Sequence, residues 1–142
     1  MRIMGLFSLA MVLILTGPTL AQAPSVEPVG TMSQLMVDII YPTSDDIFYI
    51  GRTPPSNNAE WGAIQRSALM LAESGNLLMV GSRARDQGNW IKDAKLLVDV
   101  GAAAYKAARA KDMDAILALN EQLYTACVTC HQDYRPNYRR RQ

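Results

Sequence analysis

Histidine and cysteine are scarce in this chain, and the scarcity limits the chemistry available to it. One histidine and two cysteines are present among 142 residues. A structural zinc site is almost always built from four protein ligands. These three side chains would therefore need a carboxylate or a second chain to complete such a site.

Excess charge, repeats and strand patterns are also lacking. The chain carries 14 Lys and Arg residues against 13 Asp and Glu residues, and one of the basic residues is Arg2, near the N-terminus. A polypeptide without a basic excess lacks the electrostatic signature of nucleic-acid binding, so we expect no nucleic-acid partner. We find no internal repeat and no alternating apolar and polar run of the kind that indicates a β-strand.

The available chemistry is concentrated near the C-terminus, in Cys127-Val128-Thr129-Cys130-His131. C-x-x-C-H is the attachment signature of a c-type haem. Two thiols form thioethers with one porphyrin, and the adjacent imidazole binds the iron; on a helix the three positions share one face. The alternative, a thiol–disulfide redox pair, normally comes with a strand–helix pattern that is missing here. We therefore predict one haem c per chain, bound covalently through Cys127 and Cys130 and ligated by His131.

The N-terminus has the pattern of a secretory signal peptide. Met1-Arg2 is followed by an apolar run from Ile3 to Leu15 and by small residues that end in Ala21-Gln22-Ala23. This matches a charged start, an apolar middle and a cleavage site, and the run is too short to span a bilayer comfortably. We predict a signal peptide at 1–21, with cleavage after residue 23 as the alternative, and one domain at 22–142. Export agrees with haem attachment, which takes place outside the bacterial cytoplasm, and we expect a periplasmic protein without stable membrane insertion after cleavage.

Four stretches have apolar residues at the 3–4 spacing of a helix that buries one face. They run from about Thr31 to Ile50, from Asn57 to Met79, from Asn89 to Ala108, and from Asp112 to a point before Pro136. Asn57 and Asn58 are predicted caps of the second helix, Asn89 of the third and Asp112 of the fourth. The first contains Pro42, which we expect to kink or interrupt it. Short connections between long helices favour an up-down-up-down four-helix bundle.

The signal peptide, the four helices and the motif near the end of the last helix, followed by Tyr134-Arg135, resemble the class II c-type cytochromes. This family comprises cytochrome c′ and its low-spin relatives. The resemblance covers essentially all of residues 22–142, and its most specific part is the position of the motif, because class I cytochromes c carry it near the N-terminus. It implies an all-α, antiparallel up-down-up-down bundle with covalently bound haem, and it leaves a homodimer open. Pro42 departs from the usual uninterrupted first helix.

Topology narrows the surroundings of the iron. In such a bundle, residues 32–40, 78–79 and 90–97 lie at the same end as His131. A thioether opposite the histidine gives a low-spin iron suited to electron transfer. Met36 resembles the position from which low-spin family members supply this ligand, so the predicted metal ligands are His131 and Met36. Met32, one turn earlier, and an iron without a sixth ligand are the alternatives, and in the last case Met36 is a core side chain.

Other residues receive secondary predictions. Arg135 matches a basic position that lies near the haem in the family, with a solvated helix end as the alternative. Arg83 and Arg85 belong to a polar loop at the haem end, where they either pair with haem propionates or are solvated. Trp90 and Tyr124 are predicted to pack in the haem pocket. The Arg139-Arg140-Arg141 tail either guides an acidic redox partner or has no such role.

Two functions remain open from the sequence. The first is single-electron transfer with redox partner proteins in the periplasm, in which the polypeptide fixes the haem and sets its potential. The second is a five-coordinate protein similar to cytochrome c′ that binds nitric oxide or carbon monoxide. We expect no enzyme, because a second histidine for distal acid–base chemistry is missing.

Overall fold

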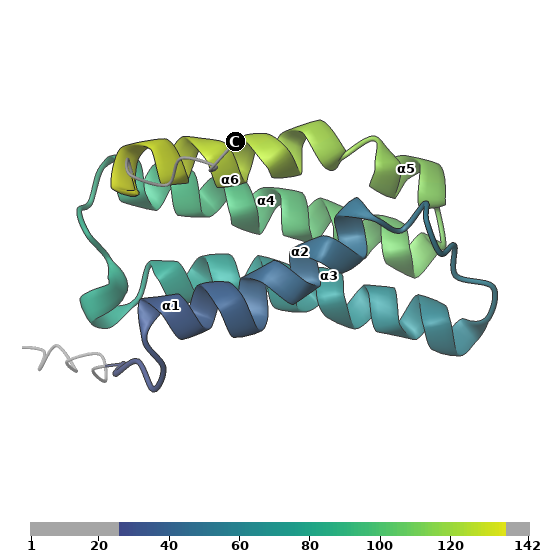
Figure 1. The fold of residues 1–142 in the computed structure, drawn as a ribbon, viewed down its shortest axis with the longest axis horizontal. Coiled ribbons are helices and arrows are strands. Elements are labelled where there is room, and N and C mark those ends of the chain that lie inside the picture. The colour runs from purple at the N-terminus through teal and green to yellow at the C-terminus, as the bar shows by residue number, and fades with distance from the viewer. Residues whose placement is uncertain (1–25, 136–142) are drawn as a thin grey trace, which may run out of the picture.

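The computed structural model describes residues 26–135, and these residues form helices and connecting loops without any strand (Figure 1). The all-α prediction is confirmed for this part of the chain. The predicted signal peptide, its cleavage sites and the Arg139-Arg140-Arg141 tail lie outside the described residues. Within residues 26–135, no helix is both long enough and apolar enough to cross a bilayer.

The first helical segment consists of α1 (Met32–Gln34), the π-helical η1 (Leu35–Ile40) and α2 (Tyr41–Phe48). A capping box begins it. The Thr31 hydroxyl accepts a hydrogen bond from the Gln34 N–H at 3.2 Å, and the Gln34 side chain accepts one from the Thr31 N–H at 2.9 Å. Such a reciprocal pair satisfies two backbone N–H groups that a helix start leaves free.

Pro42 does not end this segment, which continues to Phe48, and the irregularity lies in the π-helical turns directly before the proline. The turn before Pro42 is widened, and the Tyr41 N–H donates to the Met36 carbonyl five residues back. Proline has no N–H to continue the regular helical pattern. The helix nevertheless runs on through α2, where the Thr43 hydroxyl donates to the Ile39 carbonyl at 2.7 Å.

The second and third long helices are α3 (Asn58–Leu78) and α4 (Asn89–Ala110). The predicted cap Asn57 is confirmed, because its side chain accepts from the Glu60 N–H at 3.0 Å. The predicted cap Asn89 is wrong. Gly88 occupies the cap position, and Asp86 accepts from the Gly88 and Trp90 N–H groups at 2.7 and 3.1 Å. Between the two helices lies a short 3₁₀ helix, η2 (Gly81–Arg83).

The fourth stretch is divided into α5 (Met113–Leu117) and α6 (Asn120–Tyr134), although the sequence predicted one helix. Asp112 caps its start as predicted, accepting from the Ala115 N–H at 2.9 Å. At the division the Leu119 N–H donates to the Ile116 carbonyl, only three residues back. This tightened turn allows both Leu117 and Leu119 to pack against the core, whereas residues two apart diverge on a regular helix.

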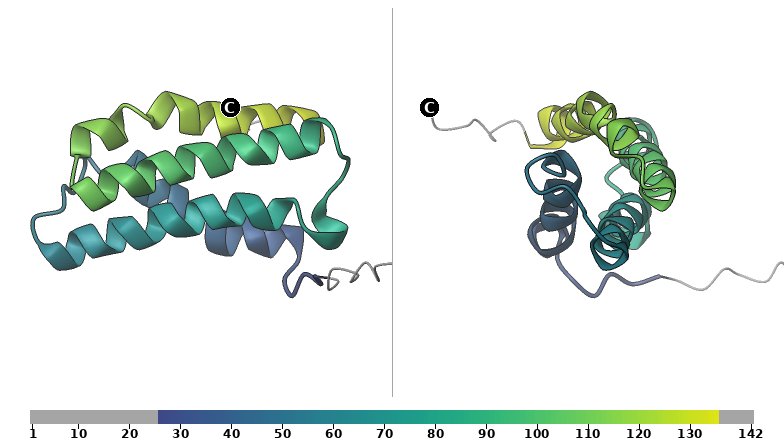
Figure 2. Two further views of the ribbon diagram at one scale, coloured as in Figure 1. Left: turned by 180° about the vertical axis from the view of Figure 1, so that it is seen from behind. Right: turned by 90° about the vertical axis from the view of Figure 1, so that its right-hand side faces the viewer.

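The long segments pack lengthwise around one apolar core (Figure 2). α4 packs against both α3 and α6, and α2 packs against α3. α3 and α4 approach especially closely at Gly75 and Gly101, which have no side chain to keep the two backbones apart. A Cβ atom built on Gly101 would lie 2.6 Å from the Ala72 nitrogen. The arrangement is compatible with a helical bundle.

Candidate functional site

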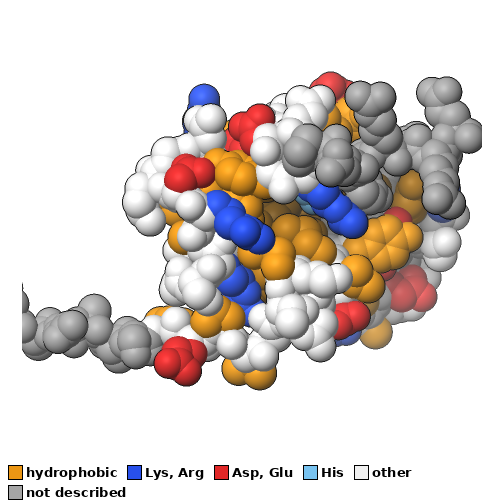
Figure 3. Space-filling view, turned by 60° about the vertical axis from the view of Figure 1, so that its left-hand side comes forward, with side chains coloured by type: hydrophobic (Ala, Val, Ile, Leu, Met, Phe, Trp, Pro, Cys, Tyr) orange, Lys and Arg blue, Asp and Glu red, His pale blue; other side chains and the backbone are white. Residues whose placement is uncertain are grey.

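A pocket of about 320 Å³ lies where the first helical segment, the start of α4 and the end of α6 meet. Its wall is made of these residues: Met32, Ser33, Met36, Val37, Arg85, Trp90, Cys130, His131, Tyr134 and Arg135. Figure 3 shows the surroundings from outside as an apolar hollow with basic side chains beside it. The volume falls within the usual range of cofactor and ligand sites.

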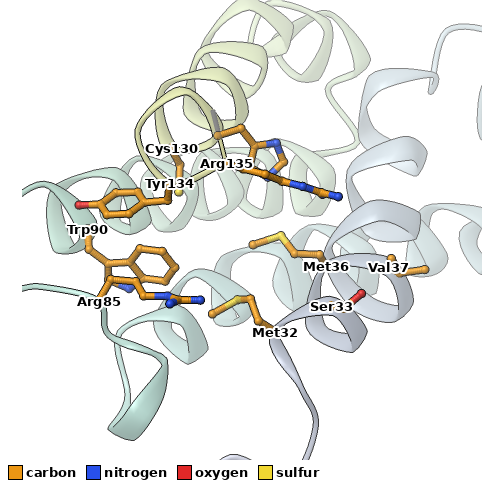
Figure 4. Close-up of a pocket in the computed structure, with 10 residues that line it drawn as sticks. Met32, Ser33, Met36, Val37, Arg85, Trp90, Cys130, Tyr134 and Arg135 are labelled. Atoms are coloured by element: carbon orange, nitrogen blue, oxygen red, sulfur yellow. The ribbon is translucent and has the colours of Figure 1, made fainter. Parts of the chain in front are cut away.

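Met36 and His131, the two predicted iron ligands, line this pocket from different elements, η1 and α6. Figure 4 shows the Met36 and Met32 side chains extending from their segment into the pocket, toward the side where Trp90 and Arg85 lie. The widened turn of η1 begins just before Met36 and belongs to the wall. Both methionines that the sequence singled out therefore reach the site.

The other methionines among the described residues lie elsewhere. Met70 is 47% exposed on α3. Met79 and Met113 are partly buried and pack against the core. None of the three lines the pocket, which leaves Met36 and Met32 as the thioethers near His131.

Cys127 and Cys130 both belong to α6, one turn apart, and both carry free thiols. Cys130 lines the pocket, whereas Cys127 packs against the neighbouring core and does not line it. Burial raises the pKa of both thiols, and for Cys130, with added repulsion from Asp93, to about 11. Thiol–disulfide exchange needs a thiolate, so a raised pKa argues against the redox-pair alternative.

His131 is half-buried at the pocket wall. Burial, and then the positive charge of Arg135, lowers the pKa of its imidazole. A lowered pKa favours the neutral ring, which is the form that binds a metal. Arg135 follows α6 as its C-terminal cap residue and also lines the pocket.

A hydrogen-bonded aromatic wall closes one side of the pocket. The buried Trp90 donates from its indole N–H to the Leu78 carbonyl at 2.7 Å. The Tyr134 ring meets Trp90 edge to face, with centroids 4.8 Å apart. The Tyr134 hydroxyl donates to the carboxylate of Asp86, and this bond raises the pKa of Tyr134 to about 12 and lowers that of Asp86. One carboxylate therefore connects the loop before α4 to the end of α6.

Sequence reasoning identified only part of this wall. Trp90 lines the pocket, but Tyr124 does not: it is 51% exposed and lies outside the pocket. Tyr124 follows the buried Leu123 directly and so points away from the core face of the helix. The pairing of Asp86 with Tyr134 joins positions 48 residues apart. Tyr134 at helical spacing from Cys130 and His131 was the signal that could have indicated it.

Asp93 is the buried acid behind the aromatic wall. It is 3% exposed, and its Oδ2 atom has no hydrogen-bond partner among the described residues. Burial raises the pKa of this carboxyl, and the charges of Asp133 and Asp86 raise it further against the opposing effect of Lys92. Asp93 follows Trp90 by three residues on α4, so both side chains lie on the helix face that is buried.

We expect an Asp93→Asn variant to be more stable than the parent at pH 8 and no more stable at pH 4. Because the folded-state pKa is raised, the parent loses stability as pH rises from the ordinary value of 3.8 through the folded value. Removing an unpartnered buried charge should gain about 1 kcal/mol above this window. Thermal unfolding at the two pH values measures it, with exposed Asp99→Asn on the same helix as control. An equal shift at both pH values would contradict the interpretation.

The residues present fit a haem on the evidence of this pocket. An imidazole and a thioether line it from different elements, and a cysteine one position before the imidazole lines it too. Among residues 26–135, no cluster of three His, Cys, Asp or Glu side chains is arranged to hold a metal ion directly. No model of a known family, no curated protein and no solved structure matches the chain.

Proposed function

We propose that the chain is a periplasmic c-type cytochrome that transfers single electrons. Haem c is attached through Cys127 and Cys130, and the iron is ligated by His131 and Met36. One observation carries the proposal: Cys130 and His131 on α6 and Met36 on η1 line the same pocket. The C-x-x-C-H spacing supplies the attachment chemistry. In this proposal the four helical segments form an antiparallel up-down-up-down bundle that holds the haem at one end.

The side chains around the pocket have distinct tasks in electron transfer. Haem c, when bound, supplies the iron that gains and loses one electron. His131 offers a neutral nitrogen, and Met36 offers a thioether, which favours the reduced state and raises the potential. Trp90, only 3% exposed and fixed by its bond to Leu78, excludes water from one side. Arg135 keeps a positive charge at the rim.

The proposal extends to location and partners. The signal-peptide pattern supports a periplasmic protein without stable membrane insertion after cleavage. The pocket opens to solvent beside exposed Arg85 and Arg135, so redox partner proteins can approach the bound group. A homodimer remains open, and no nucleic acid or enzymatic activity is part of the proposal.

Absorption spectra of the purified protein, oxidised and reduced, before and after carbon monoxide, test this function. We expect a low-spin spectrum that carbon monoxide leaves unchanged, because His131 and Met36 would both ligate the iron and leave no site for the gas. A high-spin spectrum that shifts with the gas would replace electron transfer by the gas-binding alternative. A protein without any haem absorption, isolated from cells competent in cytochrome c maturation, would overturn both.

A further inference from the structure

A second pocket, about 300 Å³ in volume, adjoins the first and is basic. It lies between residues 28–32, which lead into α1, and residues 82–85, which follow the start of η2. Met32 and Arg85 line both pockets. Arg83 is the second basic side chain of this adjoining pocket, and no Asp or Glu is part of its wall. It is therefore suited to an anion.

Arg83 is held in place across this pocket by one hydrogen bond, and its Nε donor has no acceptor among the described residues. Its Nη2 atom donates to the Gly30 carbonyl at 2.9 Å, which fixes the guanidinium against the segment before α1. Its Nε atom is buried and has no hydrogen-bond acceptor among the described residues. A buried N–H without an acceptor destabilises the fold, and such groups are rare in native proteins. The unpaired donor indicates that an acceptor from a ligand belongs here.

Arg85 connects the two pockets. Figure 4 shows its side chain passing Trp90 with the guanidinium directed toward Met32, the other residue common to both walls. Guanidinium groups bind carboxylates through parallel hydrogen bonds in a fixed planar geometry. A carboxylate bound where the two pockets meet would have both Arg85 and Arg83 in the wall around it.

A haem has two propionate carboxylates on one edge of an otherwise apolar porphyrin. The mainly apolar first pocket suits the porphyrin, and burying carboxylates there without partners would be costly. We propose that Arg83 and Arg85 bind the propionate carboxylates of the haem in the adjoining basic pocket. The inference rests on the proposed function. Beyond the C-x-x-C-H motif, Arg83 and Arg85 would orient the haem and neutralise the negative charge of its propionates.

Removing these guanidinium groups should lower the midpoint potential of the holoprotein. A nearby positive charge disfavours the ferric state, so Arg85→Gln and Arg83→Gln should each shift the reduction equilibrium by about threefold to tenfold, where tenfold is about 59 mV for a one-electron couple. Arg85→Lys retains the charge but not the planar fork. It should restore most of the potential while the propionate bending band in the resonance Raman spectrum stays displaced.

Arg109→Gln is the matched control, because Arg109 lies in the last turn of α4, far along the helix from Trp90. Arg85 is exposed, so its variants should fold even if Arg83→Gln, which loses the bond to Gly30, does not. Lower potentials together with a displaced propionate band support the inference. If the Arg83→Gln and Arg85→Gln potentials equal that of Arg109→Gln, the propionate inference is overturned but the proposed function is not. The same holds if their potentials fall while the propionate band stays in place. A parent protein without covalent haem overturns the proposed function as well.

Discussion

A Met36→Ala variant is expected to change from a low-spin to a high-spin haem spectrum and to bind carbon monoxide when reduced. Met36 projects from η1 into the pocket that His131 lines from α6. Alanine has no thioether to ligate the iron, so a bound haem would lack the ligand that Met36 would supply. The conversion should be nearly complete, and the midpoint potential should fall because the thioether stabilises the reduced iron. Absorption spectra with and without the gas measure the first effect, and redox titration measures the second.

Two methionine variants serve as controls for this result. Met70→Ala changes a side chain that is 47% exposed on α3 and outside the pocket, so its spectrum should match the parent. Met32→Ala changes the other thioether of the pocket and should also remain low-spin. If Met32→Ala opened the iron while Met36→Ala did not, the ligand assignment would pass to Met32. A parent spectrum that is already high-spin would contradict methionine ligation altogether.

A Gly101→Ala variant should be markedly less stable than the parent, although alanine is the better helix former. The added methyl group would lie 2.6 Å from the Ala72 nitrogen and 2.8 Å from its Cα atom. Backbone atoms cannot rotate away as a flexible side chain can, so α3 and α4 must separate. Overpacking of this kind costs about 1–3 kcal/mol, which corresponds to a fall in Tm on the order of 10 °C for a domain of this size.

Gly62→Ala on α3 provides the opposite expectation within the same fold. There the methyl group would meet only the end of the Arg66 side chain, at 3.5 Å. The variant should gain about 0.5–1 kcal/mol from the lower conformational freedom of alanine. Circular dichroism melts of both variants compare the two effects. A Gly101→Ala protein as stable as the Gly62→Ala protein would show that the α3–α4 contact is looser than described.

The regular parts of the fold could be predicted because their causes are local. The apolar spacing in α3 and α4 depends only on helical periodicity, and the caps Asn57 and Asp112 lie within three residues of the N–H groups they accept from. The start of α4 was misjudged because its N–H groups bond to Asp86, earlier in the loop. The sequence predicted an irregularity at Pro42 but not its form, a π-helical stretch over Leu35–Ile40 followed by continued helix.

The candidate site was predictable to a similar degree. The assumed topology grouped Met36 with His131, and the resemblance added Arg135; all three line the same pocket. Periodicity cannot show which face of a helix end meets a loop from elsewhere. For that reason the bond between Tyr134 and Asp86 was missed, as was the buried position of Asp93.

The intact mass of the protein purified from the periplasm of cells competent in cytochrome c maturation tests the central claim most directly. We predict the mass of residues 22–142 plus one haem that survives denaturation, and loss of this added mass when Cys127 and Cys130 are both replaced by serine. The mass of the bare polypeptide, in the parent as in the double variant, would contradict the assignment of a covalent haem.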